Sequence, residues 1–260
     1  MKPDYKNWMP KGMICGFLFA FLGCNVALAV FGLALTESTL RTVLTVVFAV
    51  LTLLFCVMTI WSILMYRAFD YNGKRQMARQ IIDGTAAYIN LPGGGKCLDV
   101  GCGSGALTIA VAKRNPKAEV IGVDRWGKEY ASFSKTLCED NAKAEGATHI
   151  YFSQGDATKL RFQDKNFDAV CSNYVYHNIP GDRQAYLLET LRTLKKGGIF
   201  AIHDIMSKTK YGDMQAFVKK LRDMGYEKVE LIDTTNGMFM KKSEALWMGL
   251  SGSALLVGMK

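Results

Sequence analysis

Two long apolar runs open the chain, Met13 to Leu35 and Val43 to Met65, and neither contains a charged residue. Each is long enough to cross a hydrocarbon core of about 30 Å as a helix rising ~1.5 Å per residue. The short polar link T-E-S-T-L-R-T joins them. The pattern predicts a transmembrane helical hairpin over residues 1–66. It disfavours a cleaved signal peptide, whose apolar core is shorter, and a buried pair of soluble helices.

Positive residues on both sides of the hairpin predict its orientation. Basic residues precede the first run and follow the second, namely Lys2, Lys6, Lys11, Arg67, Lys74, Arg75 and Arg79. In the link, Arg41 is balanced by Glu37. Because cytoplasmic loops carry the excess of Lys and Arg, we expect a multi-pass protein of the cell membrane. Its N-terminus and its second domain would face the cytoplasm.

Small residues recur at every fourth position of the first run, at Gly12, Gly16, Ala20 and Cys24. Such a face suits close helix packing, either within the hairpin or between protomers of a homo-oligomer. Asn25 lies near the middle of the run, where we favour an interhelical hydrogen bond over a place in a substrate path.

From residue 67 onward, strand-like and helix-like patterns alternate. The predicted helices are Asp70 to Asn90, Ala106 to Arg114, Gly127 to Glu145, a run from the Asp182 cap to Gly197-Gly198, and residues 212–224. The strands are C-L-D-V, E-V-I-G-V-D, H-I-Y-F-S, F-D-A-V-C-S-N, I-F-A-I-H-D, K-V-E-L-I and A-L-L-V-G-M. This alternation predicts an α/β domain over residues 67–260, with a doubly wound, seven-stranded, mostly parallel sheet.

The stretch from Cys97 to Gly105, C-L-D-V-G-C-G-S-G, combines a strand end with three alternating glycines. Gly101, Gly103 and Gly105 allow a tight turn and a close approach of the backbone to a ligand. The helix that follows would present its free N–H groups to that ligand.

Acidic residues follow the next two strands. Asp124 ends the second strand, where a carboxylate accepts ribose hydroxyls, and Asp156 after the third could accept a bond from an adenine amino group. Together with the glycine turn they indicate a nucleoside site. Asp99, two residues before Gly101, would repel a pyrophosphate but suits a cation. This acid and the G-x-G-x-G spacing argue against a nicotinamide dinucleotide.

The turn D-V-G-C-G-S-G resembles motif I of the class I S-adenosylmethionine-dependent methyltransferases. V-I-G-V-D-R-W is similar to the second motif of that family, G-D-A-T to the third and F-D-A-V-C-S-N-Y-V-Y-H-N-I to the fourth. L-R-T-L-K-K-G-G-I-F-A-I-H-D-I resembles the stretch that enters the fifth strand. The resemblance runs from about residue 70 to the C-terminus. It is specific for the superfamily but not for the substrate.

The resemblance implies S-adenosylmethionine as the cofactor and assigns roles around it. The glycines would line the methionine part with Asp99 near its amino group, Asp124 would hold the ribose, and Trp126 would cover the adenine. Asp156 would read the adenine edge. The implied cofactor-binding residues are Tyr71, Asp99, Gly101, Gly103, Gly105, Asp124, Arg125, Trp126, Asp156, Ala157 and Asn173.

Three residues after the fourth strand are the candidate catalytic groups: Asn173, Tyr174 and His177. Asn173 and Tyr174 would lie near the transferred methyl group. Histidine changes charge near neutral pH, so His177 is the first candidate for a general base, with a packing role equally open. His203 is better explained as a buried core histidine. Asp204 could touch the substrate, and Tyr174 and Tyr176 could line a pocket or pack.

Charge and cysteine usage exclude some functions. The net charge is +9, of which residues 1–66 carry +2 and the remainder +7. No basic run or nucleic-acid signature is present, so attraction to an anionic inner leaflet fits better than nucleic-acid binding. The seven cysteines form no C-x-x-C pair and no zinc spacing, and we expect no metal.

These patterns predict a membrane-anchored methyltransferase whose acceptor is small and possesses lipophilic character. Two alternatives stay open: a soluble metabolite as acceptor, and a non-catalytic cofactor-binding scaffold. Residues 234–250 are rich in Met, Phe and Trp, and would shape an acceptor site, touch the bilayer or simply pack.

Overall fold

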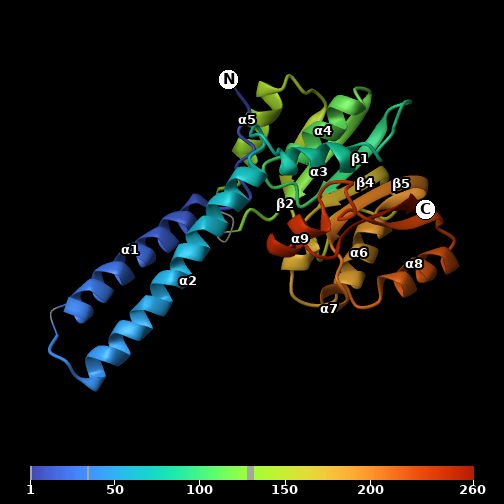
Figure 1. Ribbon diagram of the computed structural model, residues 1–260. Helices are drawn as coiled ribbons and strands as arrows, with labels where there is room; N and C mark the ends of the chain where they lie inside the picture. Colours follow the sequence, from blue (N-terminus) through green and yellow to red (C-terminus); the bar gives the residue numbers. More distant parts are fainter. Residues whose placement is uncertain (1, 34, 128–131) are drawn as a thin grey trace. The chain divides into compact units, whose positions relative to one another are not determined.

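The computed structural model describes residues 2–33, 35–127 and 132–260, which form two compact units (Figure 1). The hairpin unit comprises Asn7–Ala78. The sheet unit comprises the residues before Asn7 together with Arg79–Lys260.

The hairpin unit contains two long helices, α1 (Lys11–Leu33) and α2 (Thr39–Phe69). Their most apolar stretches have mean hydropathies of 2.3 and 2.8, and only 6% of each stretch is buried. The core helix of a soluble protein would bury such side chains, whereas here most Leu, Val and Phe residues of both helices are exposed. Both helices are candidate membrane spans by length and composition.

The link between α1 and α2 is closed by local hydrogen bonds. Ser38 caps α2 by accepting the Arg41 N–H through its hydroxyl oxygen at 3.2 Å. The Arg41 guanidinium donates to the Gly32 carbonyl at 2.6 Å, which satisfies one of the free carbonyls at the end of α1. The guanidinium also forms an ion pair with Glu37, with 3.9 Å between the nitrogen and the carboxylate oxygen.

Two of the four small residues on the α1 face, Gly12 and Gly16, do not make the predicted close contact inside the hairpin. A Cβ added to Gly12 or Gly16 would meet no atom within 4 Å, so neither glycine lets α2 approach closely. The Asn25 amide donates to the Phe21 carbonyl in its own helix at 2.8 Å, so the expected interhelical bond is absent there. Cys24 is buried. Self-association through this face stays a prediction.

The sheet unit is built on one seven-stranded sheet in the order β3-β2-β1-β4-β5-β7-β6. Among the described strands, only β7 runs antiparallel to its neighbours. The strand order along the sheet reverses between β1 and β4, which are themselves parallel. The strands are β1 (Gly95–Val100), β2 (Ala118–Asp124), β3 (Ile150–Gln154), β4 (Phe167–Asn173), β5 (Leu194–Ile205), β6 (Glu227–Asp233) and β7 (Ser253–Met259).

Helices flank the sheet, with α4 and α5 against β2 and β3, and α6 and α8 against β5 and β6 (Figure 1). Their buried faces join a core that includes Leu98, Val170 and Phe200 of the central strands. The helices are α3 (Met77–Ala86), α4 (Ala106–Arg114), α5 (Lys135–Ala144), the 3-10 turn η2 (Tyr176–Asn178), α6 (Arg183–Arg192), α7 (Lys208–Tyr211), α8 (Met214–Asp223) and α9 (Lys242–Trp247). The predicted doubly wound, mostly parallel sheet is confirmed.

Three predicted helix boundaries are wrong. α3 begins only at Met77, because Asp70 closes a turn by accepting the Asn72 N–H through its side chain. α5 begins at Lys135 behind the Ser134 cap, while residues 128–131 of the predicted helix lie outside the described residues. α6 ends at Arg192, and Gly197-Gly198 lies within β5, where Gly198 leaves room for the Leu194 side chain.

The residues before the hairpin belong to the sheet unit through Asn141 of α5. The Asn141 side chain accepts the Asp4 N–H at 2.6 Å and donates to the Asp4 carbonyl at 2.9 Å. It also donates to the Ser104 carbonyl, in the glycine turn, at 3.0 Å. Tyr5 is buried and its hydroxyl donates to Glu145. No sequence pattern predicted this attachment.

Candidate functional site

The glycine turn leaves β1 and is hydrogen-bonded to the end of β2. The Gly101 and Cys102 N–H groups both donate to the Val123 carbonyl, at 2.7 and 3.0 Å. Gly101, Gly103 and Gly105 have φ values of 76°, 56° and 82°, a left-handed backbone that side-chain-bearing residues rarely adopt. A Cβ on Gly101 would lie 2.2 Å from Val175, whereas at Gly103 only Phe133 comes within 4 Å. The turn therefore has space above Gly103.

Asp99 lies beneath this turn as a buried carboxyl group. One oxygen accepts the Thr108 hydroxyl of α4 at 2.6 Å. The other, Oδ1, has no hydrogen-bond partner among the described residues. Burial raises the pKa of Asp99 to about 7; the bond from Thr108 opposes this rise and the negative charge of Asp124 adds to it. A buried carboxyl oxygen without a partner is ready to receive a cationic ligand.

Asp124, at the end of β2, organises the neighbouring backbone. Its two oxygens accept the N–H groups of Gly103 and Trp126, both at 2.8 Å. The Trp126 indole N–H donates to the Gly103 carbonyl at 3.0 Å, so the ring of Trp126 reaches the glycine turn. Each carboxylate oxygen has a second lone pair, which leaves Asp124 able to accept ligand hydroxyls.

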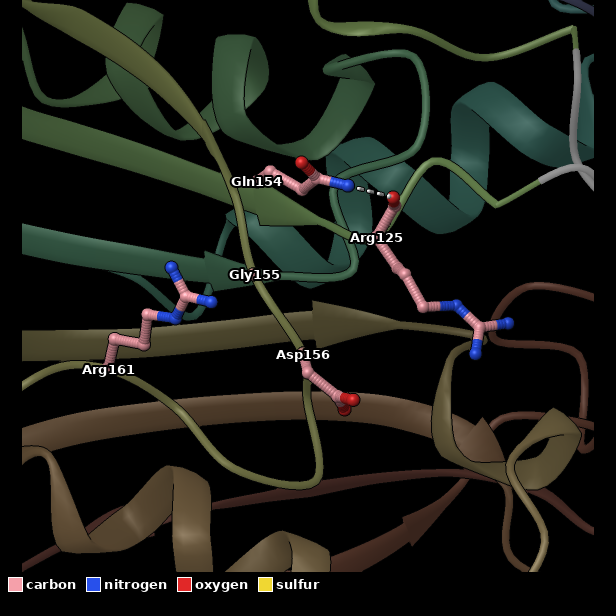
Figure 2. A pocket seen from close by; sticks show the side chains of 5 residues that line it. All are labelled: Arg125, Gln154, Gly155, Asp156 and Arg161. Carbon is pink, nitrogen blue, oxygen red and sulfur yellow. Dashed lines mark hydrogen bonds between the residues drawn. The ribbon is translucent and has the colours of Figure 1, made fainter.

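A pocket of about 250 Å³ opens beside the ends of β2 and β3 (Figure 2). Figure 2 shows Arg125 and Arg161 on opposite sides of the Gly155-Asp156 segment, with the Gln154 amide bonded to the Arg125 carbonyl. Asp156 accepts the N–H and hydroxyl of Thr158, which hold its pKa below the usual range. An ionised acceptor thus lies exposed at this pocket.

At the end of β4, Asn173 and Tyr174 are fixed by the neighbouring strands. The Asn173 side-chain oxygen lies 2.8 Å from His203 Nδ1. Tyr174 has a φ of 55°, and its hydroxyl bonds Ser253 at 2.8 Å. Its ring lies 4.7 Å from that of His203 and 5.8 Å from that of His177. Burial lowers the pKa of His203 to about 3, so this histidine is neutral and structural, as predicted.

His177, in the turn after β4, is bonded to Asp204 at the end of β5. The distance from His177 Nδ1 to Asp204 is 2.5 Å. Asp204 is fully buried, and it also accepts the Tyr211 hydroxyl at 2.8 Å and the backbone N–H groups of Tyr176 and Ile205. Burial alone would raise the pKa of Asp204, but the bonds from His177 and Tyr211 hold it below its usual value.

Sequence reasoning placed Asp204 as a possible substrate contact, and this is wrong because the carboxylate is buried and bonded within the protein. Tyr176 packs in the core with its hydroxyl on Thr190. Ala157 packs against the core beside Asp156. Tyr71 lies in the hairpin unit, so its expected cofactor role stays a prediction.

Comparison with known proteins identifies the family. The methyltransferase domain family matches residues 92–248. The chain belongs to this family. The sequence-based identification as a class I S-adenosylmethionine-dependent methyltransferase, with that cofactor, is confirmed.

The curated relatives act on quinones by name. The chain is 32% identical over 142 residues to the demethylmenaquinone methyltransferase of Anoxybacillus flavithermus, covering 53% of this chain and 56% of the relative. It is 39% identical over 108 residues to that of Staphylococcus carnosus, covering 41% of each. It is 34% identical over 107 residues to the ubiquinone/menaquinone biosynthesis C-methyltransferase UbiE of Desulfotalea psychrophila, covering 41% of this chain and 40% of the relative. The chain spans about half the length, or less, of these relatives.

Solved structures share the fold. The [4+2]-cyclase SpnF superposes with a TM-score of 0.55 at 22% identity, covering 74% of this chain and 85% of that one. The StiE O-MT domain gives 0.54 at 20% identity, covering 72% and 74%. A cyclase among them means that the fold alone does not define the reaction.

The residues present fit S-adenosylmethionine. The unpartnered oxygen of Asp99 suits an ammonium group, and the open backbone at Gly103 suits a close ligand. Asp124 retains lone pairs for hydroxyl groups. Sequence reasoning missed four residues that contact the candidate site: Thr108 and Tyr211, which bond Asp99 and Asp204, and Gln154 and Arg161, which line the pocket. No motif marks them, because each comes from a different element.

Proposed function

We propose that this protein is a membrane-anchored methyltransferase that transfers a methyl group from S-adenosylmethionine to a lipophilic hydroquinone. The observation that carries the proposal is the His177–Asp204 pair at the carboxyl ends of β4 and β5, beside Asn173. A hydroquinone must lose a proton to become nucleophilic, and this pair provides a base. The names of the quinone-modifying relatives support this acceptor class.

The cofactor would be held by Asp99 and the glycines Gly101, Gly103 and Gly105, with Asp124 on the ribose. Trp126 would cover the adenine, and Asp156 with the Ala157 backbone would read its edge beside Arg125. S-adenosylmethionine supplies an electrophilic methyl group on a sulfonium. The remaining task of the protein is to align the acceptor, remove its proton and exclude water.

His177 would act as the base and Asp204 as its positioning partner. An ionised Asp204 accepts the Nδ1 hydrogen of His177, which leaves Nε2 as the basic nitrogen. His177 takes the proton of the acceptor hydroxyl, and the electron pair released makes the adjacent ring carbon nucleophilic. The new C–C bond would form as the methyl–sulfur bond breaks, with S-adenosylhomocysteine as the leaving group. Protonated His177 would return its proton to the ring oxygen and, neutral again, would take the hydrogen of the methylated carbon and pass it to solvent, which restores the ring. Asn173 and Tyr174 would line the reacting centre.

Cofactor binding tests the first half of the proposal. Isothermal titration of the full chain in detergent should show S-adenosylmethionine binding, weakened by Asp124→Ala. A lost hydrogen bond to a charged group costs ~2 kcal/mol, which corresponds to a ~30-fold increase in the dissociation constant. Equal affinity of the two proteins, or no binding by either, would refute the assignment.

Acceptor chemistry tests the second half. We expect labelled methyl transfer to a reduced, prenylated 1,4-naphthoquinone with an open ring carbon. His177→Gln should lower kcat by ~10²-fold or more with unchanged cofactor affinity, since general bases contribute at least this factor. The control is His149→Asn, an exposed histidine that leaves the site intact. Transfer only to water-soluble extract would favour a soluble acceptor, and no labelled product in any extract would favour a scaffold.

Membrane anchoring is tested separately. We propose that α1 and α2 span the cell membrane, dividing the chain into an anchor of residues 1–66 and a catalytic domain of residues 67–260, with both ends cytoplasmic. The chain should resist extraction by alkaline carbonate, and a cysteine placed at Thr36 should react with an impermeant maleimide from outside. If Thr36→Cys were labelled only after permeabilisation, the link would face the cytoplasm and the proposed orientation would be wrong.

A further inference from the structure

The segment between β6 and β7, residues 234–252, carries an unusual share of the exposed apolar surface of the sheet unit. Among the described residues of that unit, five large apolar side chains are exposed, and three of them lie in this segment. They are Met238, Leu246 and Trp247, with 43%, 75% and 40% of their surface accessible. Single exposed apolar residues are ordinary, but three within ten residues make this segment the candidate contact surface of the unit. We call residues 234–252 the docking segment.

The docking segment is attached to the candidate active site. β7 runs antiparallel to both β5 and β6, so β6 shares the direction of β5 and its carboxyl end lies at the ligand-binding edge. From there, Thr234 bonds His203 at 3.0 Å and the Phe239 ring lies 5.3 Å from the same histidine. His203 in turn bonds Asn173. One end of the segment therefore packs behind the candidate catalytic asparagine, and its other part is exposed.

The charge of the segment selects the kind of partner. Lys241 and Lys242 are exposed and lie five and four residues before Leu246, which Trp247 follows. The one acid of the segment, Glu244, accepts the Lys241 N–H at the start of α9. Lysines next to exposed Leu and Trp are the composition of a surface that lies in the headgroup region of an anionic bilayer.

The chain itself brings a bilayer within reach. Residues 7–10 and 70–76 join the sheet unit and α3 to the candidate spans, since Asp4 and Tyr5 are bonded into the sheet unit. The longer of these links extends to at most ~25 Å. A tether of this length keeps the membrane at high effective concentration, so even a weak surface contact is populated.

We propose that the docking segment inserts its three exposed apolar side chains into the headgroup region of an anionic bilayer, with its two lysines on the lipid phosphates. The lipophilic acceptor then enters the site from the bilayer along this segment. The inference rests on the proposed function, because it assumes that the hairpin spans the membrane.

Photocrosslinking of the full chain tests the contact without an acceptor. The protein is placed in nanodiscs of phosphatidylglycerol and phosphatidylcholine, with p-benzoylphenylalanine at position 246. The control carries the same residue at position 224, where Met224 is 54% exposed at the end of α8. Illumination should give lipid adducts at 246 and not at 224. Lys241→Gln, which removes one interfacial positive charge, should lower the yield by about fivefold, and pure phosphatidylcholine should lower it too.

Three outcomes overturn the proposal. Equal lipid adducts at both positions, adducts at neither, or a crosslinked dimer of this chain through position 246 would show that the segment does not dock on lipid. A chain that does not enter nanodiscs at all would instead refute the anchoring part of the proposed function. In the separate transfer assay, no methyl transfer to the reduced naphthoquinone by the wild-type chain, together with lipid adducts at 246, would refute the acceptor assignment alone.

Discussion

The buried carboxyl of Asp99 makes a quantitative prediction about stability and pH. Burial raises its pKa to about 7, from 3.8 for an exposed aspartate. The unfolded chain therefore releases this proton near pH 4, whereas the folded chain holds it until about pH 7. Between these values the unfolded state binds fewer protons, so the free energy of unfolding falls as pH rises. Above pH 7 both states are ionised and the loss is complete.

The size of the effect follows from the shift. At 1.36 kcal/mol per unit, a shift of about three units gives a total loss of ~4 kcal/mol, of which ~3 kcal/mol falls between pH 5 and pH 8. The variant Asp99→Asn retains an oxygen for the Thr108 hydroxyl but cannot ionise. Its amide hydrogens would meet no partner at the site of Oδ1, which lowers stability equally at every pH. The diagnostic quantity is therefore the slope with pH.

The assay is thermal unfolding of the full chain in detergent, without cofactor, from pH 5 to pH 8. The Tm of the wild type should fall by ~6–12 °C more than that of Asp99→Asn over this range. The control is Asp140→Asn, which removes an exposed carboxylate from α5 and should leave the wild-type slope unchanged. Parallel curves for wild type and Asp99→Asn would refute a raised pKa and the burial argument behind it.

Two further variants test the turn and its surroundings. Gly101→Ala should lower the free energy of unfolding, measured in urea, by ~3 kcal/mol, because its Cβ meets Val175 at 2.2 Å and its φ is 76°. Gly103→Ala meets no such neighbour and should lower it by only ~1 kcal/mol. Equal losses for the two variants would contradict the packing argument. Asn141→Ala should speed hydrogen exchange at the Asp4 amide and leave α8 unaffected, as followed by mass spectrometry, whereas unchanged exchange would mean that this side chain does not hold the N-terminal residues.

The positions of the candidate cofactor residues in the fold could be predicted because they follow strand ends. Asp124 closes an alternating run of β2, and parallel strands place their carboxyl ends at one edge of the sheet. The order of the motifs along the chain then determines which strand end each acid occupies. Local pattern also predicted α4 and β4 with their observed bounds, since both are bordered by glycine, proline or polar residues.

The errors arose where a tertiary contact overrides a local signal. Gly197-Gly198 is a typical helix stop, but in the structure it lies in β5, where Gly198 makes room for Leu194. The docking segment was open to three interpretations, because neither hydropathy nor spacing reveals which of its apolar residues are exposed.

What the sequence by itself determined is the α/β fold, the glycine turn, the acids at the strand ends and two helices apolar enough to span a membrane. The tertiary structure alone decided that Asp204 is buried and directed at His177, that Tyr211 completes this cluster, and that Asp4 is bonded to Asn141. Periodicity reports the environment of one element at a time. A hydrogen bond between residues 27 or 137 positions apart depends on how several elements pack together, and no local pattern encodes that.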